Sequence, residues 1–294
     1  MALVAPFPAK EAAQNSAAHR ISRGKGAWFV LLILFVLLLG TLFPFILAAM
    51  NAIKAPADYG ANGPLAFPRS FDLTALQNFW VNVNFPRKLF NSILISACTA
   101  VLSVFLSLLN AYAIGIGRVR GGRALLVVLM ISIMAPQEAL VYPLYYMAKQ
   151  VGLFDSMISV ILILGVLHTA FGTYLLSSVL STFPKEIIEA ALIDNASRWQ
   201  ILWSVVVPVL RPTLAVLATF FFIWTWNEFL IPLVFLVSND NQTVSVSMGV
   251  LVGATTSDPT AIAAASLLGV TPTIIFFLIF QRTLTRGVAV GAVK

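Results

Sequence analysis

The sequence predicts an all-α protein that crosses a membrane six times and has both ends in the cytoplasm. Only 10% of its 294 residues are charged, whereas soluble domains carry about 25%. Long apolar runs recur along the chain, and Lys and Arg gather in alternate connecting segments. A chain this apolar would leave large hydrophobic patches exposed in water, so a lipid bilayer is its natural surroundings.

Each apolar run is long enough to be a membrane helix, which needs about 20 residues and satisfies its own backbone in lipid. A membrane β-barrel would instead show short segments of alternating polarity, and the sequence has none. The first run is too long for the core of a signal peptide, so we expect a retained helix. The predicted spans, within a transmembrane domain of residues 27–283, are about 27–50, 89–117, 124–147, 157–181, 212–237 and 260–281.

The distribution of basic residues predicts the orientation. Cytoplasmic segments of membrane proteins are enriched in Lys and Arg. With the N-terminus inside, 13 of the 18 basic residues are internal, and the external loop from Asp240 to Asp258 has none. We therefore expect a cytoplasmic tail at residues 1–26, a second at 284–294, and a cytoplasmic loop at 184–211. The formal net charge of +7 reflects this arrangement and does not indicate nucleic-acid binding.

Two acidic residues lie inside apolar runs, Glu138 and Glu228. A charge near the bilayer centre costs roughly 2.5–3.5 kcal/mol on insertion scales, so such residues usually face a cavity or a partner. Glu138 follows Pro136, and a kink there would let it reach water. Glu228 could line a pathway, contact an external protein or make a structural hydrogen bond, and the sequence leaves these alternatives open. Nearby side chains with the chemistry to contact a solute are Tyr145, Trp224, Trp226 and Asn227, although packing or lipid-interface anchoring explains the aromatic residues as well.

The sequence does not support metal binding, catalysis or ATP binding by this chain. Cys98 is the only cysteine and the two histidines are His19 and His168, so we expect no metal site. The sparse acids form no catalytic pair within one loop, so we expect no catalytic residues. No Gly-x-x-x-x-Gly-Lys-Ser/Thr segment occurs, so the chain is not expected to bind ATP itself.

The internal loop is the most informative stretch. Pro184 suits a helix start, Glu186 suits the first turn, and Asn195 suits a left-handed stop. Ile187, Ile188, Ala191 and Leu192 recur at helical spacing and predict one apolar stripe. A second helical stretch is predicted over 197–207, ending at Pro208. The first helix could lie on the bilayer or dock into a cytoplasmic partner. Its three acids, Glu186, Glu189 and Asp194, favour a protein partner.

This loop resembles the one that marks permease subunits of binding-protein-dependent ABC importers. Glu189-Ala190-Ala191, then Asn195-Ala196, then Val205-x-Val207-Pro208 follow its spacing, with Asn in place of Gly and Val in place of Ile and Leu. The resemblance extends over about residues 25–294 and is closest to the smaller permease of maltose-type sugar importers. Further matching motifs, in order, are Asn91-Ser92, Pro143-Leu144-Tyr145, Leu153-Phe154-Asp155, Trp226-Asn227-Glu228-Phe229-Leu230 and Gln281-Arg282 with the tail to Lys294.

The resemblance implies a type I ABC importer permease fold in the bacterial inner membrane. It implies a second permease subunit (a heterodimer), two copies of a cytoplasmic ATPase that bind ATP and Mg, and an external solute-binding protein. Glu186, Glu189, Ala190, Ala191, Asp194, Asn195, Ala196 and Pro208 would belong to the loop that couples to the ATPase. Gln281, Arg282 and Lys294 would belong to a tail that reaches the ATPase. The solute would be a carbohydrate or a carbohydrate-like compound.

Two other functions compete. An ion-gradient-driven carrier should show internal repeats with broken helices at matching positions, and none is convincing here. A membrane enzyme needs a catalytic constellation, which the acids do not provide.

Overall fold

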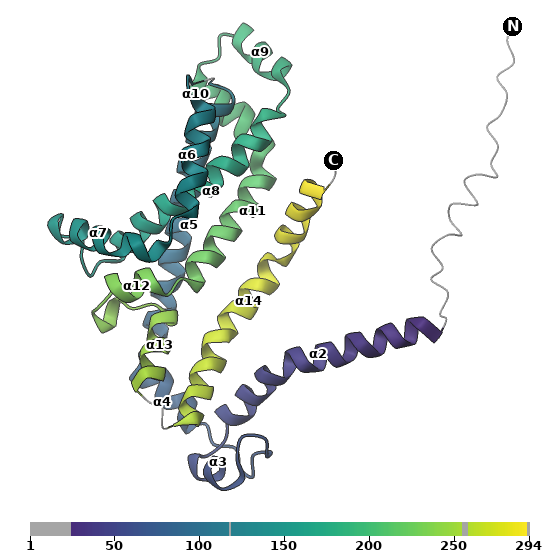
Figure 1. The fold of residues 1–294 in the computed structure, drawn as a ribbon, viewed down its shortest axis with the longest axis vertical. Coiled ribbons are helices and arrows are strands. Elements are labelled where there is room, and N and C mark those ends of the chain that lie inside the picture. Colours follow the sequence, from purple (N-terminus) through teal and green to yellow (C-terminus); the bar gives the residue numbers. More distant parts are fainter. Residues whose placement is uncertain (1–24, 118, 255–257, 293–294) are drawn as a thin grey trace, which may run out of the picture. The chain divides into compact units, whose positions relative to one another are not determined.

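The computed structural model describes residues 25–117, 119–254 and 258–292, and every regular element in these ranges is helical. The chain divides into two compact units, residues 1–48 and 49–294. The elements, drawn in Figure 1, are α2 (Lys25–Ala52), α3 (Pro56–Asn62), α4 (Thr74–Asn82), α5 (Phe85–Gly115), α6 (Gly122–Met134), α7 (Gln137–Gln150), α8 (Met157–Ser181), α9 (Lys185–Ile193), α10 (Arg198–Gln200), π-helix η1 (Ile201–Val206), α11 (Val207–Asn227), α12 (Leu230–Phe235), 3-10 helix η2 (Asn239–Asn241), α13 (Val244–Ala254) and α14 (Pro259–Ala292).

Five stretches of helix in the described residues are long and apolar enough to cross a membrane: 27–52, 85–115, 157–181, 198–227 and 259–282. A sixth span is formed only if α6 and α7 are taken together, and these two helices meet at a bend of 97°. The all-α class and the count of up to six spans agree with the sequence prediction. The bend falls at Ala135–Pro136, where we expect a kink, because proline cannot continue a helix without losing a hydrogen bond.

The first unit contains most of α2. The large apolar side chains along this helix are exposed on every side, from 42% at Leu42 to 68% at Trp28. A helix that is apolar all round is suited to lipid or to another protein within the membrane.

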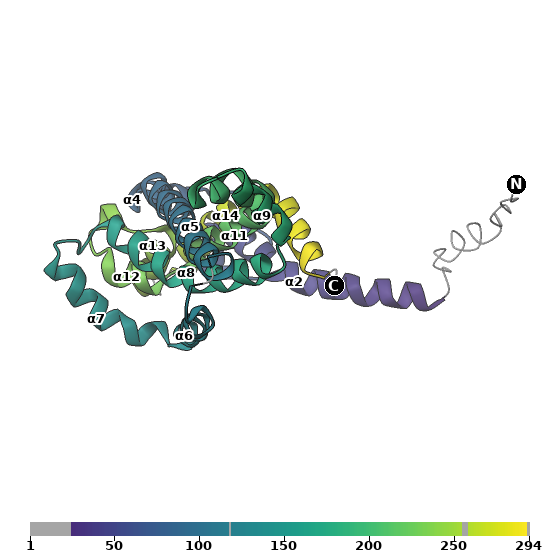
Figure 2. The same ribbon diagram turned by 90° about the horizontal axis from the view of Figure 1, so that it is seen from above.

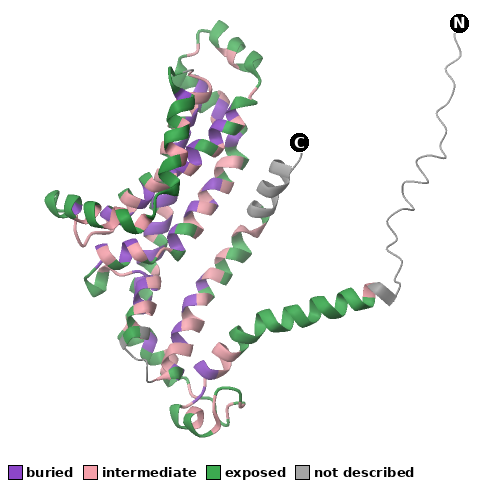
Figure 3. Ribbon diagram, in the orientation of Figure 1, coloured by how far each residue is buried: buried purple, intermediate pink, exposed green. Residues whose placement is uncertain are grey.

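The second unit is built around α5, α8 and α11, which lie side by side in both views (Figures 1 and 2). Small residues allow α5 and α8 to approach closely, as is common between membrane helices. A Cβ at Gly172 would overlap the Ser107 side chain and lie 2.9 Å from the Phe221 ring. The Ser103 hydroxyl donates across the interface to the Gly165 carbonyl at 3.1 Å. The buried residues of this core run along all three helices (Figure 3).

The prediction that a helix ends at Pro208 is wrong. The chain passes from α10 through the π-helix η1 into α11, which continues past Pro208 and Pro212. Because the change from π- to α-helical hydrogen bonding occurs at Val206–Val207, Pro208 falls in the first turn of α11, where a missing N–H is tolerated.

Candidate functional site

Helix α9 lies at the inner end of the α5–α8–α11 bundle, on the side predicted to be cytoplasmic (Figure 1). Ile188 and Ala191 are partly buried against the core formed by these helices. Glu186, Glu189 and Ala190 are exposed. The single apolar stripe expected from the sequence is therefore divided, because Ile187 and Leu192 are 44% and 53% exposed.

The end of α9 is fixed by its backbone. Asn195 has a φ of 57°, the left-handed conformation expected for this residue. The Ala196 N–H donates to the Ala191 carbonyl at 3.0 Å, and the Asn195 N–H donates to the Leu192 carbonyl at 3.1 Å. This pair of bonds is the Schellman arrangement, which satisfies the last carbonyls of a helix. The turn therefore has a defined geometry although its tip is exposed.

The next helix begins directly after this turn. The Gln200 N–H donates to the Ser197 hydroxyl at 3.3 Å, and the Ser197 N–H donates to the Gln200 side-chain oxygen at 2.8 Å. This reciprocal pair is a capping box. The Tyr112 hydroxyl, near the end of α5, donates to the Arg198 carbonyl at 2.9 Å. The turn after α9 is thus connected to α5 through this hydrogen bond and to α11 through the chain itself.

The exposed side of α9 combines acidic and apolar groups. Glu186, Glu189 and Asp194 are all exposed. Ile193, the last residue of α9, is 80% exposed. Such a surface can make charge pairs with basic groups and bury apolar area in one contact, and the small Ala190 leaves room for close approach.

Glu228 lies at a break between α11 and α12. Its Oε1 accepts hydrogen bonds from the N–H groups of Leu230, at 3.0 Å, and Ile231, at 3.3 Å. It therefore caps α12, and the negative charge suits the positive end of that helix. The neighbouring Asn227 is exposed, and its side-chain N–H donates to the Ile223 carbonyl at 2.8 Å.

The aromatic residues singled out from the sequence lie in different surroundings. Trp226 is buried, stacks on Phe222, and donates from its indole N–H to the Thr273 hydroxyl at 3.1 Å. Tyr145 is half-buried and has the Lys149 ammonium 4.6 Å from its ring centre. Trp224 is 40% exposed. Trp224 is thus the member of this group with the most accessible ring.

Glu138 is exposed in the first turn of α7, two residues beyond Pro136. Gln281 and Arg282 lie far along α14, where the Gln281 side-chain N–H donates to the Leu278 carbonyl at 3.0 Å. Lys294, the last residue of the expected tail, lies outside the described residues.

The predicted external end is held by polar contacts that were not predicted from the sequence. The connector of residues 236–243 joins α12 to α13, and the side-chain N–H of Asn91 donates to its carbonyls of Asp240, at 2.7 Å, and Gln242, at 3.0 Å. Asp155 accepts hydrogen bonds from the hydroxyl and N–H of Ser238. Burial acts to raise the pKa of Asp155, but the hydrogen bonds from Ser238 and Asn241 lower it by more, so the net pKa is below its usual value.

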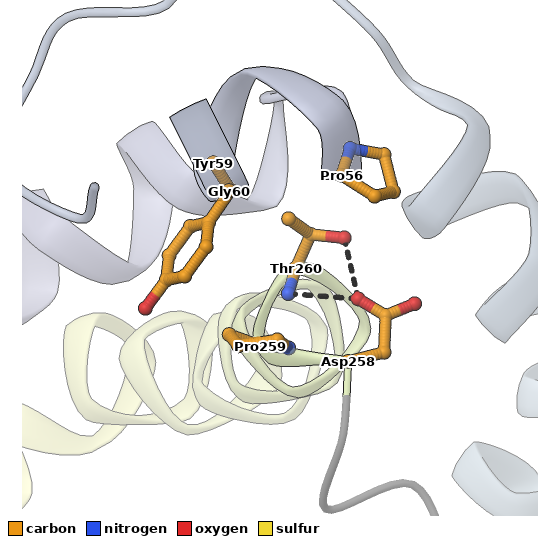
Figure 4. A pocket seen from close by; sticks show the side chains of 6 residues that line it. All are labelled: Pro56, Tyr59, Gly60, Asp258, Pro259 and Thr260. Atoms are coloured by element: carbon orange, nitrogen blue, oxygen red, sulfur yellow. Dashed lines mark hydrogen bonds between the residues drawn. The ribbon is translucent and has the colours of Figure 1, made fainter. Parts of the chain in front are cut away.

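A pocket of about 490 Å³ opens on the same side between α3 and the start of α14 (Figure 4). Pro56, Tyr59 and Gly60 line one side, and Asp258 and Thr260 line the other. Asp258 Oδ1 already accepts bonds from the Thr260 N–H, at 3.0 Å, and hydroxyl, at 2.8 Å. The carboxylate therefore serves to start α14.

The long apolar helices define an integral membrane protein. Residues 28–290 match the family described as "Binding-protein-dependent transport system inner membrane component". The chain belongs to this family, and it is a multi-pass protein of the bacterial inner membrane. Members of this family are permeases and not enzymes themselves.

Relatives and a solved structure agree with this assignment. The chain is 34% identical over 204 residues to "Putative ABC transporter permease protein ORF1" of Streptomyces antibioticus, covering 69% of this chain and 89% of that one. It is 28% identical to the diacetylchitobiose uptake system permease protein DasC of Streptomyces coelicolor, covering 88% and 94%. It is 26% identical to the melibiose/raffinose/stachyose import permease protein MelC of Bacillus subtilis, covering 94% and 99%. Its fold matches a bacterial ABC transporter involved in alginate import with a TM-score of 0.74 and 21% identity, covering 95% and 99%.

Proposed function

We propose that this chain is one of two permease subunits of an ATP-driven, binding-protein-dependent importer for a carbohydrate. The observation that carries the proposal is the position of the Glu189-Ala190-Ala191 segment on α9. This helix rests on the inner ends of the membrane helices and turns its acids outward. The names of the relatives, which concern di- and oligosaccharides, support a carbohydrate as the solute.

In this proposal α9 is the coupling helix. Glu189, Asp194 and the exposed Ile193 contact a groove on a cytoplasmic ATPase, while Ile188 and Ala191 hold α9 against the membrane core. The Schellman turn at Asn195 and the capping box at Ser197 make the connection stiff. Closure of the ATPase dimer around ATP then displaces α9, and the displacement alternates access to the pathway between the two sides. ATP and Mg are bound by the ATPase and not by this chain.

The other partners follow from the same assembly. The exposed apolar surface of α2 fits lipid and a second, different permease subunit. An external binding protein delivers the solute. Gln281, Arg282 and the tail to Lys294 are proposed to reach toward the ATPase, and the pathway is proposed to include Glu138, Tyr145 and the region of Trp226, Asn227 and Glu228.

The test is reconstitution of the chain with a partner permease, an ATPase and a binding protein in proteoliposomes. A panel of lactose, raffinose and diacetylchitobiose is supplied outside, with ATP and Mg inside. We expect uptake that requires ATP and persists when ionophores dissipate proton and sodium gradients. Uptake by the chain alone, driven by an ion gradient and independent of ATP, would show that it is a secondary carrier.

A further inference from the structure

The exposed surface of the polypeptide changes character at the bend between α6 and α7. On α6 beyond Arg123, the exposed side chains are apolar apart from Ser132, with Val128 at 59% and Ile131 at 62%. Beyond Pro136, residues at spacings of four on α7 are Glu138, Tyr142 and Tyr146, all of them exposed. Residues i, i+4 and i+8 lie on one side of a helix. We name this row the α7 stripe.

One side of α7 packs against the protein, whereas Ala139, Pro143 and Met147 form a second exposed row. Val141, Leu144, Tyr145 and Ala148 contact a core shared with α8 and α12. Tyr145 is further enclosed by Lys149 and Phe154, whose ring lies 5.1 Å away edge-on. The α7 stripe is therefore an exposed row that borders the packed side of the helix, and α7 is drawn almost entirely as exposed or half-exposed in Figure 3.

The depth of Glu138 argues that the stripe faces water. Arg120 and Arg123 place the start of α6 near the inner membrane surface. The 13 residues of α6 then rise about 20 Å, whereas the hydrocarbon core is about 30 Å thick. Glu138 follows directly, so its carboxylate lies at a depth where charged groups almost always face a water-filled cavity or a partner. The exposed row of Ala139, Pro143 and Met147 continues the apolar surface of α6 and suits lipid, whereas the α7 stripe carries a carboxylate and two hydroxyls.

The chemistry of the stripe suits a carbohydrate. The rings of Tyr142 and Tyr146 are 70% and 48% exposed, with centres 4.8 Å apart, and the Tyr142 hydroxyl lies 3.2 Å from the Tyr146 hydroxyl. Aromatic rings offer an apolar face to the C–H side of a sugar, and phenol and carboxylate oxygens hydrogen-bond its hydroxyls. The stripe extends over about 12 Å, at 1.5 Å per residue, which is comparable to a di- or trisaccharide.

We propose that Glu138, Tyr142 and Tyr146 form a saccharide-binding strip on this subunit, facing the outer part of the translocation pathway. The inference rests on the proposed import function. In this inference the chain itself contacts the solute, through Tyr142 and Tyr146, which were not predicted as site residues from the sequence.

Thiol labelling in the assembled complex tests the strip. Because Cys98 is the only cysteine, Cys98→Ser gives a cysteine-free chain into which Tyr142→Cys is introduced. Controls are Val128→Cys on the aliphatic surface of α6 and Phe71→Cys on the external loop, where Phe71 is 84% exposed. The probe is a membrane-impermeant maleimide added outside. The complex with its binding protein and ATP is labelled with and without the saccharide of the panel that wild type transports.

We expect position 142 to react at a rate near that of position 71. Position 128 should react more than about tenfold more slowly, because the reactive thiolate is suppressed in apolar surroundings. Saccharide at ten times the dissociation constant measured for the Tyr142→Cys complex, which keeps Tyr146, should slow labelling at 142 about tenfold and leave 71 unchanged. Labelling at 142 as slow as at 128 would place the stripe in lipid, and fast labelling without protection would make it a solvated surface; either result overturns the proposal.

A second measurement separates the contribution of the two aromatic rings from that of their hydroxyls. It also distinguishes failure of the saccharide-binding strip from failure of the proposed import function. In the complex, Tyr142→Ala with Tyr146→Ala should abolish uptake while ATPase assembly is retained, and Tyr142→Phe with Tyr146→Phe should keep part of it because the stacking faces remain. Unchanged uptake in the double alanine variant contradicts the strip alone. Absence of ATP-dependent saccharide uptake in wild type contradicts the import function itself.

Discussion

Replacing Asn195 tests whether the backbone stop of α9 controls the loop. Asn195 has a φ of 57°, a conformation that costs ordinary L-residues roughly 1–2 kcal/mol and that Asn and Gly adopt routinely. Asn195→Val should therefore destabilise the turn by about 1–2 kcal/mol, since a β-branched side chain tolerates this region least. Asn195→Gly should leave the turn intact.

The consequence can be measured at the bond that closes the turn. The Ala196 N–H donates to the Ala191 carbonyl at 3.0 Å, so its hydrogen exchange reports opening of the Schellman arrangement. A loss of 1–2 kcal/mol raises the open population about 5- to 30-fold, and exchange at Ala196 should accelerate by that factor in Asn195→Val. The assay is hydrogen exchange followed by mass spectrometry on the assembled complex in nanodiscs, alongside solute-stimulated ATP hydrolysis.

A matched control comes from the opposite end of the protein. Asn84 has a φ of 53° just before α5, so Asn84→Val imposes a similar backbone penalty without touching α9. We expect faster exchange near Asn84 and normal exchange at Ala196. Wild-type exchange at Ala196 in Asn195→Val, or equal acceleration in Asn195→Gly, would refute the argument from backbone conformation.

Three further predictions concern the membrane helices and the external end. Glu228→Gln keeps an acceptor for the α12 N–H groups and should retain the stability of the complex. Glu228→Ala should lower that stability by about 1–3 kcal/mol in thermal unfolding, and equal losses in both variants would assign the role to the charge. Gly172→Ala should destabilise the protein by about 1–3 kcal/mol, because the added Cβ would meet Ser107 and Phe221. Gly60→Ala, which has open space around the added Cβ, should be nearly neutral. Equal melting temperatures of the two variants would contradict the close packing of α5 and α8. Because the pKa of Asp155 is lowered from 3.8, its carboxylate stabilises the connector above that pH, and this contribution is lost as the pH falls through the folded-state pKa. Asp155→Asn should therefore weaken the fall in melting temperature at acid pH. The same fall in the variant as in wild type would contradict this role.

The parts of the fold that local sequence determines were predictable. The apolar runs specify membrane helices because length and hydropathy suffice in lipid. The stop at Asn195 follows from local backbone preference, and the break near Pro136 follows from the missing proline N–H. The end predicted at Pro208 is wrong because a proline in the first turn of a new helix has the same sequence signature as one that terminates a helix.

Features that depend on distant contacts were not predictable. The indole ring of Trp226 is of a kind that can contact a solute. In the structure, however, its N–H donates a hydrogen bond to Thr273, 47 residues away on α14. Helix α13 lies in the stretch predicted as an external loop, and its start is held by the Ser92 hydroxyl, which accepts from the Val244 N–H at 2.9 Å. The exposure of Tyr142 and Tyr146 depends on the 97° bend and on which side of α7 packs against α12. Spacings of four along α7 were the only local signal for that stripe.

The most direct test of the central claim is co-purification of the chain with its ATPase, comparing wild type with Glu189→Lys. Gln77→Lys, which introduces the same side chain at an exposed position of α4 on the predicted external side, serves as the control. The proposed coupling role predicts that wild type and the control retain the ATPase and its solute-stimulated hydrolysis, and that Glu189→Lys loses one or both. Full retention of binding and stimulation in Glu189→Lys, or no ATPase bound to wild type, would contradict the coupling role of α9.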